Sequence, residues 1–205
     1  MSEFQNGGPP EQAPRTGNEW GILVILSFFF VLFLVLELAR EFSTAKLSVP
    51  FFLLSWGLLL VIHEFGHALM ARFVGWRVKL ISIGTGRIVS RLMLAGMPLE
   101  FRAIPLSGFV IPEAVDDRLP DLKQFLIFAA GPGAELICVG LMVAVFGSEV
   151  LLKRTPDVFL IAIQSFCVAA LLGVFMNLLP FSHETKGGRG WSDGLGMILC
   201  WRKAA

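Results

Sequence analysis

Four long apolar runs dominate the hydropathy pattern of the chain. They lie at residues 21–39, about 50–72, about 124–147 and about 158–180. Each approaches the roughly 20 residues that an α-helix needs to cross a hydrocarbon core of about 30 Å. Pro50 stands at the start of the second run, where the first turn of a helix tolerates proline. The pattern predicts an all-α polytopic membrane protein with about four transmembrane helices.

Residues 77–112, between the second and third runs, follow a different pattern. Their β-branched and alternating apolar residues are interrupted by Gly84, Gly86, Gly96 and Gly108. Short strands joined by turns have this composition. We therefore expect a small membrane-associated insertion that resembles a β-hairpin.

Polar residues outside the apolar runs predict the ends and the orientation of the chain. Residues 1–19 are rich in Gly, Pro, Gln and Asn, which is typical of a disordered, solvated tail, and leave 20–205 as the membrane domain. The side of the membrane that holds this tail carries 13 of the 17 Lys and Arg residues, and the opposite side carries 4. The positive-inside rule then places both termini and the β insertion in the cytoplasm. We expect a multi-pass protein of the cell (inner) membrane.

Composition agrees with this assignment and excludes one large class of function. The chain is 55% hydrophobic and 16% charged, and its mean hydropathy is +0.73. A net charge of +1 without a long basic run argues against nucleic-acid binding, which needs a clustered positive surface. The three cysteines are far apart and lie mostly in apolar runs, so we interpret them as small buried side chains.

The second apolar run contains the sequence VIHEFGHALMAR at residues 61–72. His63 and His67 are four residues apart, so a helix presents them on one face, and Glu64 lies beside them. The pattern HExxH on a helix is typical of a zinc protease, with two imidazole ligands and a glutamate general base. Counted from Pro50, His63 lies about 20 Å along the helix, roughly a third of the way in from the cytoplasmic face.

A catalytic zinc usually has three protein ligands, so a third ligand must come from another element. Asp193 and His183 both follow the fourth apolar run, which ends on the same predicted side of the membrane as the HExxH turn. We favour Asp193, because it precedes an apolar stretch that could re-enter the membrane. His183 is the alternative, and its polar surroundings are more typical of an exposed loop.

Several motifs together resemble the site-2 protease family, the intramembrane zinc metalloproteases of peptidase M50 type. They are HEFGHALMAR, IPLSGFV, AAGPGAEL, and NLLPF followed by SDG, and they extend over about residues 50–200. The resemblance implies that His63, His67 and Asp193 bind one Zn²⁺ ion per chain and that Glu64 is the catalytic base. It also implies that Asn177 orients the substrate or stabilises the oxyanion, and that the IPLSGFV strand pairs with the substrate backbone.

Two features depart from the common family pattern. Glu135 occupies a position where the family commonly has asparagine, four residues after Gly131. Pro180 precedes Asp193 by thirteen residues, a wider gap than in the common form. The chain also leaves no room for the PDZ domain that many members insert.

These observations predict an intramembrane zinc endopeptidase that cleaves within or next to transmembrane segments of membrane-anchored proteins, in regulated intramembrane proteolysis. The alternative is a zinc-binding membrane scaffold without proteolytic activity. Glu64 favours the enzyme, because metal binding alone does not require a general base beside the first histidine. Gly and Pro at positions 131–133 could open a path for water, or could serve only in helix packing.

Overall fold

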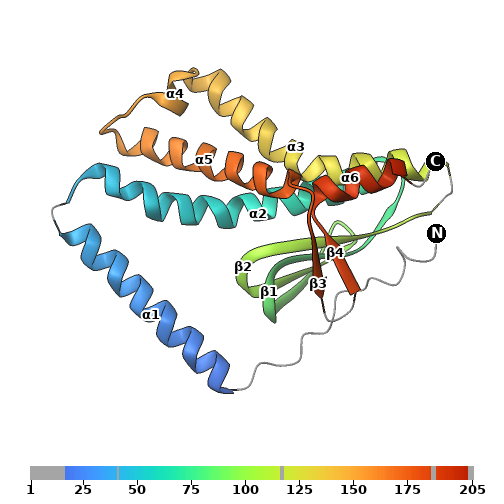
Figure 1. Ribbon diagram of the computed structural model, residues 1–205, viewed down its shortest axis with the longest axis horizontal. Coiled ribbons are helices and arrows are strands. Elements are labelled where there is room, and N and C mark those ends of the chain that lie inside the picture. Colours follow the sequence, from blue (N-terminus) through green and yellow to red (C-terminus); the bar gives the residue numbers. More distant parts are fainter. Residues whose placement is uncertain (1–16, 41, 116–117, 186–187, 203–205) are drawn as a thin grey trace.

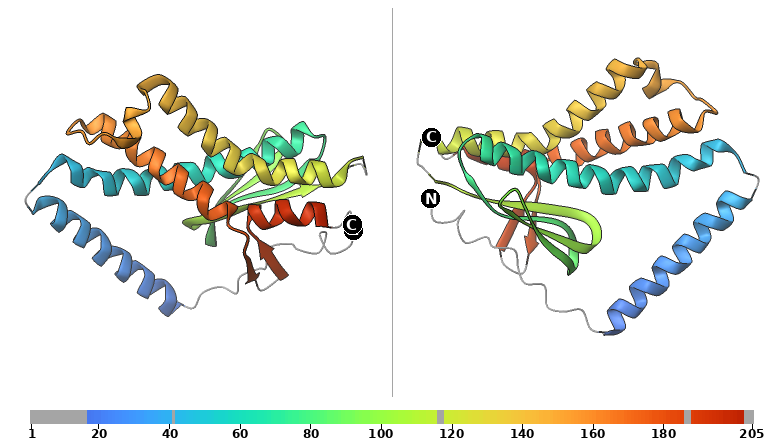
Figure 2. Two further views of the ribbon diagram at one scale, coloured as in Figure 1. Left: turned by 45° about the horizontal axis from the view of Figure 1, so that its top comes forward. Right: turned by 180° about the vertical axis from the view of Figure 1, so that it is seen from behind.

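Three long helices pack against one another and form the body of the molecule (Figure 1). They are α2 (Ser48–Phe73), α3 (Pro120–Phe146) and α5 (Val158–Leu178). The computed structural model describes residues 17–40, 42–115, 118–185 and 188–202. A β-hairpin lies along one side of α2, and the helix α1 (Gly17–Ala39) extends away from the other helices, as both views in Figure 2 show.

The predicted helical membrane fold is confirmed. Three helical stretches are long and apolar enough to span a membrane: Thr44–Phe73, Pro120–Phe146 and Val158–Leu178. The first of these joins the short 3-10 helix η1 (Thr44–Leu47) to α2. Within α1, the described apolar side chains form a shorter stretch, Ile25–Ala39, and most of them are exposed, which suits contact with hydrocarbon.

The predicted tail, residues 1–19, falls mostly on residues 1–16, which lie outside the described part of the chain. Residues 17–19 are the first residues of α1.

Two further helix starts have local causes in the sequence. Pro120 begins α3, where its missing N–H costs nothing. Asp157 caps α5 by accepting hydrogen bonds from the amides of Phe159 and Leu160 at 2.8 and 3.0 Å.

The insertion between α2 and α3 is the predicted β-hairpin. Strands β1 (Arg77–Leu94) and β2 (Met97–Glu113) pair antiparallel. They join through a two-residue turn at Ala95 and Gly96, whose φ values of 50° and 78° match a turn with left-handed central residues. The ladder is irregular, because residues 81–83 of β1 each face two different parts of β2, near Leu99 and near Val110.

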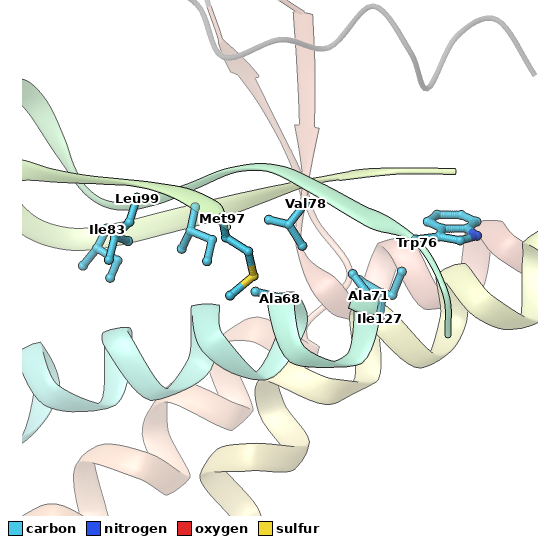
Figure 3. Close-up of a cluster of buried hydrophobic side chains, with 9 residues drawn as sticks. Ala68, Ala71, Trp76, Val78, Ile83, Met97, Leu99 and Ile127 are labelled. Carbon is cyan, nitrogen blue, oxygen red and sulfur yellow. The ribbon is translucent and has the colours of Figure 1, made fainter. Parts of the chain in front are cut away.

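The hairpin is held against α2 by a buried hydrophobic cluster (Figure 3). Helix α2 contributes two alanines, and the strands contribute larger apolar side chains that cover them. The cluster comprises Ala68, Ala71, Trp76, Val78, Ile81, Ile83, Met97, Leu99 and Ile127. Because Ala68 and Ala71 have small side chains, the sheet can approach the same end of α2 that carries the two histidines.

The chain end after α5 returns to the histidine-bearing end of α2. Two short strands, β3 (Ser182–Thr185) and β4 (Gly188–Trp191), pair antiparallel and lead into α6 (Asp193–Arg202). Helix α6 packs along α3 (Figure 2), and the one-turn helix α4 (Glu149–Leu152) lies between α3 and α5 in the chain. The apolar stretch after Asp193 therefore forms a short helix, and Asp193 is its first residue.

Candidate metal centre

Two histidines of α2 direct their ring nitrogens toward one point. His63 and His67 are one helical turn apart, and their Nε2 atoms are separated by 3.0 Å. Both residues are buried, with 5% and 7% of the whole residue exposed. The helix therefore presents two imidazole groups at a site from which bulk water is largely excluded.

Asp193 completes this group from the far end of the chain. Its Oδ2 lies 3.0 Å from His63 Nε2, and its Oδ1 lies 3.4 Å from His67 Nε2. Burial by itself raises the pKa of Asp193, but the hydrogen bonds with the two histidines outweigh burial and lower the pKa to about 2. The carboxyl group is therefore ionised at neutral pH, as a metal ligand must be.

The three side chains fit the donor set of a tetrahedral zinc. Ligand atoms at about 2.0–2.1 Å from such an ion lie about 3.3 Å from one another. The three separations between His63, His67 and Asp193 are 3.0, 3.0 and 3.4 Å, close to that value. Among the described residues, these three form a group able to bind a metal ion, with one donor atom from each within 4.8 Å of the others.

Ser192 holds Asp193 in this place. Its hydroxyl donates to the Leu179 carbonyl at 2.6 Å and accepts from the amides of Phe181 and Leu195 at 3.2 and 3.3 Å. The first two bonds tie the start of α6 to the end of α5, and the third is an N-cap bond of α6. Sequence reasoning missed this role, although a serine before an apolar helical stretch is a recognisable cap signal.

The outer nitrogen of His67 also has a fixed partner. His67 Nδ1 lies 2.6 Å from the Ile127 carbonyl oxygen of α3. A carbonyl can only accept, so Nδ1 carries a proton, and Nε2 is the ring nitrogen that faces the site shared with Asp193. Metal-binding histidines commonly have such an outer partner, which fixes the ring and its tautomer.

Glu64 lies beside the metal-binding group and has little contact with polar partners. Only 4% of its surface is exposed, and its Oε2 has no hydrogen-bond partner in the described part of the chain. Buried oxygens are almost always bonded, so a free one marks a place where a reacting group or water can sit. Gly108 of β2 borders it, since a methyl group added there would lie 2.6 Å from Glu64 Oε1.

Gly131 of α3 leaves the space in front of the histidines open. A methyl group added at this position would lie 2.7 Å from His63 Nε2 and 2.5 Å from His67 Cε1. No side chain larger than hydrogen fits there without moving the rings. Glycine at position 131 therefore preserves the room that a bound ion would require.

Comparison with known proteins agrees with this geometry. Residues 51–184, most of the chain, match the profile of peptidase family M50. The chain belongs to peptidase family M50. This is a family of zinc metalloproteases, and the HExxH residues His63, Glu64 and His67 lie within the matched range.

Each match to an individual relative of this M50 chain covers only part of that relative. The chain is 28% identical over 149 residues to a Campylobacter jejuni protein named for a zinc metalloprotease, which covers 66% of this chain and 40% of the relative. It is 34% identical over 100 residues to the regulator of sigma-E protease RseP of Escherichia coli, covering 42% of this chain and 22% of RseP. The chain thus spans less than half the length of these curated relatives.

Two further predicted site residues of this M50 chain, Asn177 and His183, lie on different elements. Asn177 is half-buried at the end of α5, next to Leu178, whose carbonyl touches the backbone of Gly194 beside Asp193. His183 lies in β3, and its side chain lies outside the described part of the structure. Asn177 therefore directly precedes the residue of α5 that contacts the start of α6.

Glu135 lies near the site, and its partner could not be predicted from the sequence. It lies in α3, is 3% exposed, and places Oε2 3.4 Å from His63 Nδ1. An ionisable residue inside a predicted membrane helix was the available signal, because such residues usually have a partner or a function. Which partner it meets depends on the packing of α3 against α2.

Proposed function

We propose that this protein is an intramembrane zinc endopeptidase that hydrolyses peptide bonds within or next to transmembrane segments of membrane-anchored proteins, in regulated intramembrane proteolysis. One observation carries the proposal. Three side chains able to bind a metal ion, the two histidines buried and Asp193 partly buried, lie together on and beside a helix long enough to span a membrane, next to a buried glutamate whose Oε2 has no hydrogen-bond partner among the described residues. Ionisable groups at such positions are costly and are usually functional.

Each residue of the group has a proposed role. His63, His67 and Asp193 hold one Zn²⁺ ion, which would polarise the scissile carbonyl and lower the pKa of water from about 15.7 to near 7. Glu64 accepts the proton of the attacking water and passes it to the leaving amine. Its free Oε2 supports this role, since a general base must have an unoccupied lone pair facing the reaction. A zinc-binding scaffold would not need that oxygen.

The membrane orientation is part of the same proposal. The side of the membrane that holds the N-terminal tail carries 13 of the 17 Lys and Arg residues, which supports cytoplasmic termini. In that orientation the metal centre lies near the cytoplasmic end of α2, together with the β-hairpin. A membrane-anchored substrate would then be cleaved close to the cytoplasmic face.

The hairpin supplies a candidate binding edge for the substrate. Pro105, Leu106 and Ser107 are exposed and have no pairing partner in β1. The next residue, Gly108, borders Glu64. An extended substrate segment could pair with this edge and replace the hydrogen bonds lost when its own helix unwinds. Asn177, near the start of α6, could then orient that segment.

Cleavage by a Glu64→Gln variant tests the proposal. The protein is co-expressed with a panel of membrane-anchored reporter proteins, and their cleaved fragments are measured. We expect the wild type to cleave at least one reporter and Glu64→Gln to abolish that cleavage while zinc stays bound. Glu149→Gln is the control, because this carboxylate is exposed on α4 and pairs with Lys153 at 3.4 Å. Wild-type cleavage by Glu64→Gln would overturn the proposed mechanism.

A further inference from the structure

The Glu135 carboxylate lies between two other helices. On one side its Oε2 is 3.4 Å from His63 Nδ1 of α2. On the other side it faces Gly173 of α5, where an added methyl group would lie 3.0 Å from Oε1. The side chain of Glu135 is 4% exposed and that of His63 is 7% exposed. A carboxylate is therefore enclosed at the point where α2, α3 and α5 meet.

This buried carboxylate has one candidate partner. Among the described residues, its only ion pair is the one with His63. Within the described ranges, neither Glu135 Oε2 nor His63 Nδ1 has a hydrogen-bond partner elsewhere. A buried charge without a partner is strongly unfavourable, and so is an unbonded buried N–H. The separation of 3.4 Å is slightly longer than the usual range of roughly 2.7–3.2 Å for such bonds.

Glu135 of α3 faces the outer nitrogen of His63 as the Ile127 carbonyl of α3 faces the outer nitrogen of His67. His67 Nδ1 faces the Ile127 carbonyl, and His63 Nδ1 faces the Glu135 carboxylate. On α2, His63 lies four residues before His67. On α3, Glu135 lies eight residues after Ile127. The contacts run in opposite order along the two helices, as they do between antiparallel helices. Each histidine directs Nε2 toward Asp193 and Nδ1 toward α3.

We infer that Glu135 is a positioning residue of the metal centre, which accepts the Nδ1–H of His63 and fixes the ring with Nε2 toward the metal. The inference rests on the proposed zinc site of His63, His67 and Asp193. A carboxylate behind a metal-binding imidazole holds the ring orientation and raises its basicity. Gly173 belongs to the same arrangement, because it leaves the space that the carboxylate occupies.

Zinc affinity of the purified, full-length protein in detergent tests this role. Zinc is titrated in competition with a chromophoric chelator for the wild type, Glu135→Gln and Glu135→Leu. We expect Glu135→Leu to weaken zinc binding about 10–100-fold, as loss of such an outer partner typically does. Glu135→Gln, whose amide oxygen can still accept the His63 proton, should retain more affinity than Glu135→Leu. A residue that only fills space would show no such order, since leucine and glutamine are similar in size.

A spectroscopic measurement identifies the histidine through which Glu135 acts. The chain has three histidines, so ¹⁵N-histidine labelling gives a simple spectrum. In the zinc-loaded protein, Glu135→Leu should shift the Nδ1 signal of His63 and leave that of His67 unchanged, because His67 is bonded to Ile127. Glu100→Gln is the matched control, a buried carboxylate of the hairpin that pairs with Arg91 and Arg102.

The outcomes separate this inference from the proposed function. The wild type binding zinc, and Glu135→Leu showing the same zinc affinity and the same His63 signal as the wild type, would overturn the inference and leave the proposed function standing. A wild-type protein that binds no zinc would overturn the proposed function and the inference with it. Should Glu135→Leu fail to fold, Glu135→Gln decides, since it must shift the His63 signal and lower zinc affinity if the inference holds.

Discussion

Replacing Gly131 with alanine tests the position of the metal centre most directly. The added methyl group would lie 2.7 Å from His63 Nε2 and 2.5 Å from His67 Cε1. His67 Nε2 would lie closer still. Carbon and nitrogen atoms in contact are normally about 3.5 Å apart, so the rings must retreat by about 1 Å or more. A displacement of about 1 Å at a reacting site costs roughly 100-fold in rate. We expect Gly131→Ala to lose tightly bound zinc and to cleave a reporter at least about 100-fold more slowly.

The assay measures zinc per chain by mass spectrometry and reporter cleavage in proteoliposomes from the same preparation. Gly133→Ala, two residues along α3, is the matched control, because no atom lies within 4 Å of its added methyl group. Alanine favours a helix over glycine by about 0.8–1 kcal/mol, so this variant should fold, bind zinc and cleave as the wild type does. Normal zinc content and cleavage in Gly131→Ala would refute the metal position. Equal losses in both variants would show that α3 requires glycine for another reason.

Two further substitutions separate metal binding from catalysis. Asp193→Ala removes one of the three proposed ligands and should weaken zinc binding by more than the 10–100-fold typical of an outer partner. His183→Ala should leave zinc binding unchanged. Zinc content after dialysis measures both variants, and the reverse result would move the third ligand to His183. In Gly108→Ala, the added methyl group lies 2.6 Å from Glu64 Oε1 and from the Ser82 carbonyl, so the carboxylate must shift. That variant should keep its zinc while kcat falls about 100-fold, and unchanged kcat or loss of zinc would contradict the role of Glu64.

Much of this protein follows from local patterns. The apolar runs predicted the helices because a span of about 20 apolar residues is a property of one segment. The glycine-punctuated stretch after the second run predicted the hairpin for the same reason. The spacing of His63 and His67 predicted a shared helical face, and the structure confirms that their Nε2 atoms lie 3.0 Å apart.

The rest of the candidate site required contacts between distant segments. Asp193 reaches His63 across 130 residues, through a contact between α5 and α6 that Ser192 and Gly194 make possible. The sequence could name Asp193 and His183 as candidates and could not bring either to the histidines. Periodicity within one helix carries no information on which neighbour will face it.

The sequence by itself determined which segments are long and apolar enough to span a membrane and which helix carries the candidate metal-binding histidines, because hydrophobicity and helical spacing are local. Tertiary structure alone decided which groups surround those histidines. Packing of α3 against α2 places Gly131 before the rings and Glu135 behind His63, and the hairpin places Gly108 at Glu64. These contacts depend on how close helices and strands approach one another, and that distance is set by the small residues at their interfaces.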